Sequence, residues 1–299
     1  MSEQHVNLYE AHAGQINSEE AQLLKEHEPS IEFHVVQENL SQGRQSRVSV
    51  LEYERSGQKY RVLWKRMGAN KALEAEEAQL LQSRLQPYRQ SLIDAGWRVP
   101  HLLYTKVAQL SGENQIFSYE QFIAGGDGEK VFGDPSEPNF RKWFLMNEVI
   151  ATLAHYPEKD LHRTSLAGKI LTRLPHGLDL KLANCVLEPA SNELYFVDLF
   201  GPKELDKNKN WLTYSTKLDN LNQESLLAVC ASREGAILRC WRLAEQHWHN
   251  AINSASELRS EFISRLTDTN LPAKEQSFII EEISQDYPWL NKLYKESKI

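Results

Sequence analysis

The sequence predicts an α+β fold, in which a β-rich N-terminal region carrying one helix precedes a mainly α-helical region. Runs of β-branched and aromatic residues separated by short turns favour strands between residues 31 and 124, and helical patterns dominate from residue 125 onward. Residues 1–30 are polar and charged, which favours a helical N-terminal extension. We therefore expect an extension (1–30), a β-rich region (31–124) and an α-helical region (125–299).

The composition is that of a globular protein and excludes several classes. The chain has 299 residues, of which 41% are hydrophobic, and a formal net charge of −7. An acidic balance argues against nucleic acid as a partner, because phosphate binding favours a basic surface. Three cysteines without a CxxC pair exclude a disulfide framework and a zinc ribbon. No secretory signal and no apolar run of about 20 residues is present, so we expect a cytoplasmic protein without a membrane partner.

The β-rich region contains five expected strands and one helix. Ser56-Gly57 and Ser111-Gly112 supply turns, so two antiparallel hairpins are expected around them. Between the hairpins, Lys71 to Ala95 carries apolar residues at helical spacing, and Pro87 should break or restart that helix. The expected strands are Ile31 to Val36, Val48 to Glu54, Tyr60 to Met67, Leu102 to Ala108 and Ile116 to Ile123.

The C-terminal region begins with a glycine-rich stretch that is typical of a linker, at Gly125, Gly126 and Gly128. Two helices are expected next, followed by two short strands and then an almost wholly helical segment from about Leu218. The expected helices are Phe140 to Tyr156 and Asp160 to Leu174, and the expected strands are Cys185 to Leu187 and Glu193 to Leu199.

One segment carries residues suited to phosphoryl transfer. Asp179, Lys181 and Asn184 lie in a loop, and Asp198 ends an apolar strand shortly before Gly201. Phosphoryl transfer uses one carboxylate to orient the attacking hydroxyl, while an amide oxygen and a second carboxylate hold magnesium against the phosphates. A carboxylate at the end of a buried strand also needs a partner, and a metal ion would supply one.

This segment resembles the protein-kinase-like superfamily. Asp179, Lys181 and Asn184 match the Asp-x-Lys-x-x-Asn catalytic loop, and Asp198-Leu199-Phe200-Gly201 is similar to the metal-binding Asp-Phe-Gly. Upstream parts follow in the family's order, so the resemblance spans roughly residues 35 to 201. It implies a bilobal fold, with an antiparallel-sheet N-lobe carrying one helix and a mainly helical C-lobe. It also implies ATP and Mg²⁺ as cofactors.

The resemblance also implies a role for each matching residue. Asp179 would orient the acceptor hydroxyl, Lys181 would offset charge on the transferring group, and Asn184 and Asp198 would bind magnesium. Lys65 would hold the ATP phosphates and would itself be held by Glu77, with Glu74 and Glu76 as competitors. The remaining ATP-binding residues would be Gly43 and Ser46 in the phosphate loop and Glu120 and Phe122 at the adenine hinge.

Departures from the family pattern leave the substrate open. The phosphate loop keeps only Gly43 of three glycines, and His176 lies one residue earlier than the family's histidine. No Ala-Pro-Glu follows Gly201 and the remaining chain is short, which favours small-molecule kinases of the aminoglycoside and choline type. Lys181 is the choice of protein kinases at its position. The leading expectation is an ATP- and magnesium-dependent phosphotransferase acting on the hydroxyl of a small molecule. A Ser/Thr protein kinase and a pseudokinase scaffold are the alternatives.

Overall fold

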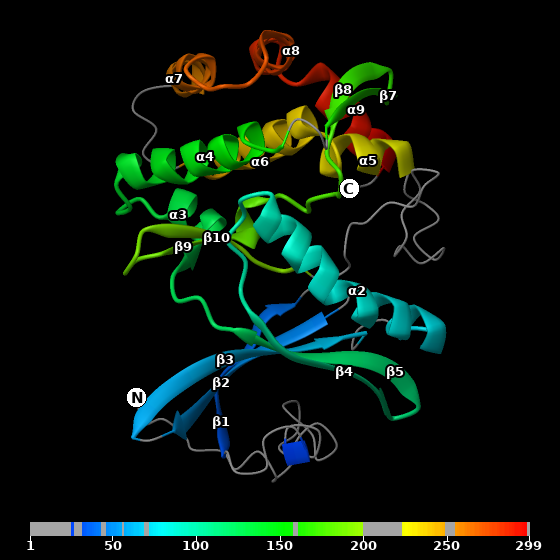
Figure 1. Cartoon of the computed structure of the whole chain (residues 1–299). Helices are drawn as coiled ribbons and strands as arrows, with labels where there is room; N and C mark the ends of the chain where they lie inside the picture. The colour runs from blue at the N-terminus through cyan, green and yellow to red at the C-terminus, as the bar shows by residue number, and fades with distance from the viewer. Residues whose placement is uncertain are drawn as a thin grey trace. The chain divides into compact units, whose positions relative to one another are not determined.

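The computed structural model shows a mixed α+β protein made of two compact units (Figure 1). It describes residues 25–26, 32–42, 46–55, 57–68, 72–157, 161–199, 223–248 and 255–297. The first unit comprises Met1–Gln86 and Pro100–Ile123, and the second comprises Pro87–Val99 and Ala124–Ile299. The expected helical extension over residues 1–30 lies outside the described residues except for Lys25 and Glu26.

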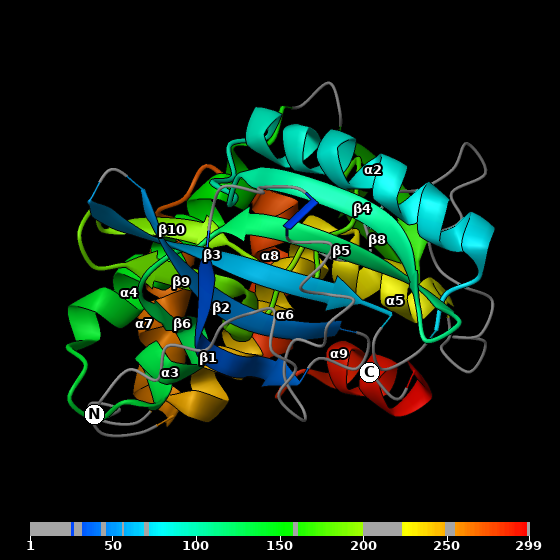
Figure 2. The ribbon, with the colours of Figure 1, turned by 90° about the horizontal axis from the view of Figure 1, so that it is seen from below.

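An antiparallel five-stranded sheet forms the body of the first unit, with strand order β1-β2-β3-β5-β4 (Figure 2). All five expected strands are confirmed, with somewhat longer bounds for most of them. Gly57 has φ 76° and Gly112 has φ 84°, so both expected turns use a glycine where the backbone is left-handed. The strands are β1 (Phe33–Gln42), β2 (Ser46–Arg55), β3 (Gln58–Met67), β4 (Leu102–Leu110) and β5 (Glu113–Gln121).

The two faces of this sheet differ in chemistry. One face is aromatic and buried, because Phe33, Trp64, Phe117 and Tyr119 pack together there. On the other face the strand register aligns Val48 with Lys65 and Lys65 with Ser118. Since side chains two positions apart share a face, Glu120 lies on this second face as well. The second face therefore combines small apolar residues with buried charges.

Helix α2 (Ala75–Asp94) runs without interruption through Pro87, so the expected break is wrong. A proline removes one backbone donor, and the buried side chains on either side of it, Leu85 and Tyr88, hold the helix together. The division between the units falls at this proline. Residues 87–99, which we expected within the β-rich region, contribute Tyr88, Leu92 and Trp97 to the core of the second unit.

The second unit is built around helix α6 (Arg233–His247), which contacts α3, α4, α5, α8 and α9 (Figure 1). Trp241 on α6 is fully buried and stacks on Phe262, with ring centroids 4.0 Å apart. Trp248 is buried in the same core. The other helices are α3 (Gly128–Gly133), α4 (Asn139–Ala154), α5 (Gln223–Cys230), α7 (Ala255–Thr267), α8 (Ala273–Ser284) and α9 (Pro288–Ser297).

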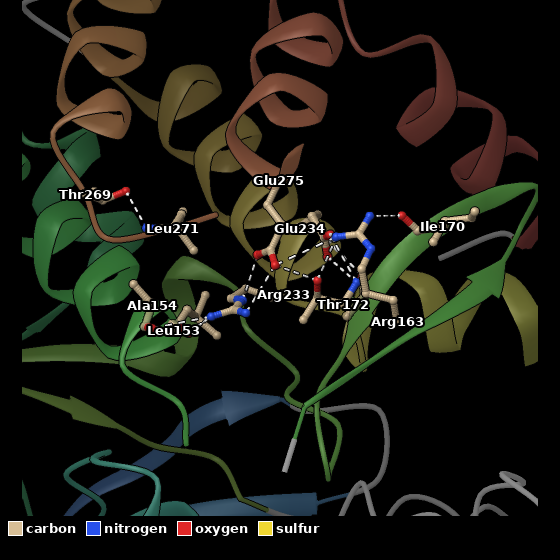
Figure 3. Close-up of polar contacts among 12 residues, drawn as sticks. Leu153, Ala154, Arg163, Ile170, Thr172, Arg233, Glu234, Thr269, Leu271 and Glu275 are labelled. Atoms are coloured by element: carbon tan, nitrogen blue, oxygen red, sulfur yellow. Dashed lines mark hydrogen bonds and ion pairs between the residues drawn. The ribbon is translucent and has the colours of Figure 1, made fainter. Parts of the chain in front are cut away.

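We expected a helix over residues 160–174, but residues 162–173 form a β-hairpin instead. Strands β7 (His162–Leu166) and β8 (Lys169–Arg173) pair across a turn in which Ala167 and Gly168 both have positive φ. Buried charges anchor this hairpin to the helices (Figure 3). The Thr172 amide donates to both carboxylate oxygens of Glu234, at 3.0 and 2.9 Å, and its hydroxyl donates to Glu275. These tertiary bonds outweigh the helical pattern of the segment.

The glycines at 125, 126 and 128 are not a linker, because Gly126 lies in a strand of a small sheet and Gly128 begins α3. Gly126–Asp127 form strand β6, which pairs with β9 (Cys185–Glu188), and β9 pairs with β10 (Glu193–Phe196). Gly125 has φ 138°, and a Cβ there would lie 2.4 Å from the carbonyl oxygen of Leu187. Only glycine permits this close approach of two backbones. In the described part of the chain, no helix has both the length and the apolar character needed to cross a membrane.

Candidate functional site

In the first unit, the candidate site centres on Lys65 in β3. Its ammonium nitrogen lies 3.3 Å from Oε2 of Glu120 in β5, and the two side chains are only 4% and 3% exposed. The hydroxyl of Ser118 donates to the other carboxylate oxygen of Glu120 at 3.3 Å. The sheet itself therefore orients this lysine, because its carboxylate partner comes from the neighbouring strand.

The carboxylate that meets Lys65 is thus not the one we expected. Glu77 lies half-buried in the first turn of α2, and Glu74 and Glu76 are exposed. The expected pairing of Lys65 with Glu77 is replaced by the pairing with Glu120, which the resemblance assigned to the adenine hinge. The register of β3 and β5 explains the difference, since it places Lys65 and Glu120 on the same face of the sheet.

The other residues expected to bind ATP are only partly described. Phe122 is half-buried and packs against a cluster of Val48, Val50 and Leu63 on the same face as Lys65. Ser46 begins β2 and is paired with Met67. Gly43 lies outside the described residues.

In the second unit, the segment from Leu174 to Lys181 forms a loop that leads into a short 3-10 helix (Leu182–Asn184) and is fixed by backbone hydrogen bonds to the junction of α5 and α6. The amide of Leu174 donates to Ala231 at 2.9 Å, and the amide of Leu178 donates to Cys230 at 2.5 Å. The hydroxyl of Tyr88 donates to the carbonyl of Gly177 at 2.8 Å. These bonds hold the backbone on the N-terminal side of Asp179 in a single conformation.

His176 supports this loop from within the core. It is buried, its ring meets the ring of Tyr88 edge-on, and its Nε2 lies 3.4 Å from the hydroxyl of Tyr156. Burial raises the pKa of Tyr156, although a hydrogen bond from Trp97 acts in the opposite direction. His176 therefore packs against two aromatic side chains, and one of them, Tyr88, binds the loop backbone at Gly177.

The carboxylate of Asp179 has two cationic neighbours. Its Oδ1 lies 2.7 Å from Nη1 of Arg239 on α6, and its Oδ2 lies 4.0 Å from Nζ of Lys181. Asp179 and Lys181 remain 31% and 35% exposed, whereas the arginine is 11% exposed. The predicted catalytic pair is therefore partly accessible to solvent, and the arginine beside it is less exposed than either member.

Asn184 and Asp198, the expected metal ligands, are linked through one short network. The side-chain amide nitrogen of Asn184 donates to the carbonyl of Asp179 at 2.8 Å, and its backbone carbonyl accepts from Val197 at 2.7 Å. Asp198 follows directly, half-buried and with φ 57°. Aspartate adopts this left-handed conformation more readily than most residues, because its short polar side chain can hydrogen-bond locally.

These residues fit magnesium by their chemistry. The amide nitrogen of Asn184 points to Asp179, which leaves its oxygen as the atom to face a cation, and hard divalent cations prefer oxygen ligands. The described residues contain no group of three or more His, Cys, Asp and Glu side chains that could hold a metal ion without further ligands. Magnesium would therefore depend on phosphate and water oxygens to complete its coordination, as is usual for this ion.

Two of these contacts were missed at the sequence level. Arg239 lies in the apolar run Ala236-Ile237-Leu238-Arg239-Cys240-Trp241. A single charge in such a run indicates a buried ion pair, and this signal could have identified it. The carboxylate of Glu120 offered a similar signal, because it lies between Tyr119 and Phe122 in a strand pattern rich in apolar residues. Neither pattern identifies the residue with which the charged side chain forms its ion pair.

A separate pocket of about 310 Å³ lies elsewhere in the second unit. It is lined by Phe140, Arg141, Trp143, Phe144, Asn147, Leu187, Asn192 and Arg265. None of these residues belongs to the predicted site.

Comparison with known proteins adds no assignment, since neither a protein-family model nor a curated protein matches this sequence.

Proposed function

We propose that the protein is an ATP- and magnesium-dependent phosphotransferase with a protein-kinase-like bilobal fold, which transfers the γ-phosphate to the hydroxyl of a small molecule. The supporting observation is the connection through Asn184, which bonds to Asp179 on one side and to Val197, the neighbour of Asp198, on the other. Asn184, itself an expected metal ligand, is thus bonded to the main chain of Asp179 and to the main chain of the residue that precedes Asp198, the second expected ligand.

Each residue has a defined part in the proposed reaction. Asp179 accepts the hydrogen bond of the acceptor hydroxyl through its exposed carboxylate and aligns the oxygen for attack. Lys181, 4.0 Å from that carboxylate, offsets negative charge on the transferring group. Lys65 binds the phosphates of the nucleotide. Asn184 and Asp198 would hold magnesium, which offsets phosphate charge when bound.

A pseudokinase scaffold is the second candidate, and the Lys65–Glu120 pair favours it. The lysine is already paired with a buried carboxylate, so phosphate must compete with Glu120 for the same ammonium group. In this alternative the protein binds nucleotide weakly or not at all, and its role is interaction with other proteins.

Thermal unfolding with ATP and Mg²⁺ tests the proposal. A ligand at about 100 times its Kd stabilises a protein by roughly 2.7 kcal/mol, which is readily measured. We expect a magnesium-dependent increase in Tm for the wild type and its loss in Asp198→Ala. Asp94→Ala is the matched control, because it removes an exposed aspartate at the end of α2 and should keep the full shift.

A wild type without any magnesium-dependent shift would contradict the phosphotransferase and favour the scaffold. If the shift is present, [γ-³²P]ATP with a panel of small hydroxyl compounds identifies the acceptor class. Label that appears only on the protein itself would favour the Ser/Thr protein kinase.

A further inference from the structure

We infer that Arg239 is a positioning residue that holds the carboxylate of Asp179 in its productive orientation. This inference rests on the proposed function, because it assigns Arg239 a part in the same reaction.

The contacts of Arg239 connect the loop to the core of the second unit. Its Nη1 lies 2.7 Å from Oδ1 of Asp179 and donates to Sγ of Cys230 at 3.3 Å. The backbone carbonyl of Cys230 accepts from the amide of Leu178, the residue before Asp179. Cys230 therefore holds both the backbone next to Asp179 and the guanidinium that binds its side chain. The buried residue Cys230 thus helps to fix both the main chain next to Asp179 and, through Arg239, its side chain.

Helix α6 provides a rigid base for this contact. The hydroxyl of Ser232 caps the helix by accepting from Gly235 at 3.0 Å. The residues on either side of Arg239, Leu238 and Cys240, are fully buried. A guanidinium on a packed helix has few alternative positions, so it imposes its geometry on the more exposed aspartate.

Arg239 and Lys181 lie next to different oxygens of the Asp179 carboxylate. Oδ1 is bound by Arg239, whereas Oδ2 lies toward Lys181 at 4.0 Å on the exposed side. Burial disfavours the charge of Arg239, yet Cys230, Asp179 and Tyr294 more than compensate, so its pKa is raised and it is permanently cationic.

The competing explanation is that Asp179 is only the structural partner of a buried arginine. The two explanations differ in what happens to the rate in protein that remains folded. A positioning residue changes kcat, because a small displacement of an aligned group slows the reaction strongly, whereas nucleotide affinity is set elsewhere. A structural pair changes the amount of folded protein and leaves kcat unchanged.

The test is steady-state ADP release with Mg²⁺–ATP, with water as the acceptor, for Arg239→Gln, Arg239→Lys and Asp179→Asn. We expect Arg239→Gln to lower kcat about 10- to 100-fold and to change the KM for ATP by less than about twofold. Arg239→Lys, which keeps the charge, should give an intermediate kcat. Because Arg239 acts through Asp179, the double variant Asp179→Asn/Arg239→Gln should be no slower than Asp179→Asn alone.

Arg233→Gln is the matched control on the same helix. Arg233 is 5% exposed and its Nε lies 2.8 Å from Glu275, in the network of Figure 3, so its loss removes a buried pair outside the site. It should lower Tm while kcat of the folded fraction stays within about twofold of the wild type.

The outcomes separate the two proposals. A wild type with neither ADP release nor a Mg²⁺–ATP shift in Tm overturns the proposed function, and this inference with it. An active wild type together with an unchanged kcat in Arg239→Gln overturns the inference alone. A loss of kcat in Arg233→Gln equal to that in Arg239→Gln also overturns the inference alone. If Arg239→Gln does not fold, a wild-type kcat in Arg239→Lys overturns the inference, and an intermediate kcat supports it.

Discussion

Replacing Glu120 by glutamine should destabilise the five-stranded sheet strongly, because it removes a buried negative charge that faces the Lys65 ammonium group. The two side chains are 3% and 4% exposed, and their charged atoms are 3.3 Å apart. Removing one partner of a buried ion pair costs about 3–5 kcal/mol, since the remaining charge stays in a medium that solvates it poorly. The double variant Lys65→Met/Glu120→Gln removes both charges and should lose less than the sum of the two single variants.

Glu77→Gln is the matched comparison. Glu77 is half-buried in the first turn of α2, and the structure does not place its carboxylate against Lys65. The change should therefore cost less than about 1 kcal/mol, as is usual for residues outside a buried network. The contrast between two glutamate-to-glutamine changes tests which carboxylate holds the lysine.

Hydrogen exchange of the β3 and β5 amides measures this effect locally, which matters in a protein of two units. A loss of about 3 kcal/mol corresponds to exchange that is roughly a hundredfold faster in these strands. If Glu120→Gln accelerated exchange no more than Glu77→Gln, the ion pair would contribute nothing, and the assignment of Glu120 as the partner of Lys65 would be wrong.

Two further changes probe the second unit. Gly125→Ala should cost about 2–4 kcal/mol in the free energy of unfolding, because φ is 138° and the new Cβ would meet the Leu187 carbonyl, whereas Gly133→Ala, with open space around it, should be neutral. Equal denaturation midpoints for the two variants would refute this account. Burial raises the pKa of Glu234 above its ordinary value of 4.5, and the nearby Glu275 adds to the rise. A raised pKa means that the folded state retains this proton longer than the unfolded state, so the associated stability is present at low pH and is lost as pH rises through the folded pKa. In urea unfolding at several pH values, the free energy of unfolding of Glu234→Gln should therefore rise relative to that of the wild type as pH increases. A difference in this free energy that does not change with pH would contradict the raised pKa.

Local patterns predicted much of the secondary structure. All five strands of the first unit follow from β-branched and aromatic runs between glycine turns, and this alternation is a property of neighbouring residues. Segment 160–174 is one that local sequence patterns do not predict. Its apolar spacing is helical, but the Thr172 backbone bonds to Glu234, 62 residues away in the chain, and such a contact leaves no local period. The helix also continues through Pro87, where the buried side chains of Leu85 and Tyr88 pack against the cores of the molecule, and the order of residues alone does not show that packing.

The candidate site likewise combines residues that the sequence predicts with contacts that only the tertiary structure shows. The sequence alone placed Asp179, Lys181, Asn184 and Asp198 in one region, because loop spacing and the end of an apolar strand are readable along the chain. Only the tertiary structure decided which groups they meet. Arg239 contacts Asp179 across 60 residues, and Glu120 replaces Glu77 beside Lys65 because two strands pair in one particular register. Ion pairs depend on distance in space and on burial, and neither quantity is encoded in the spacing of residues along the chain.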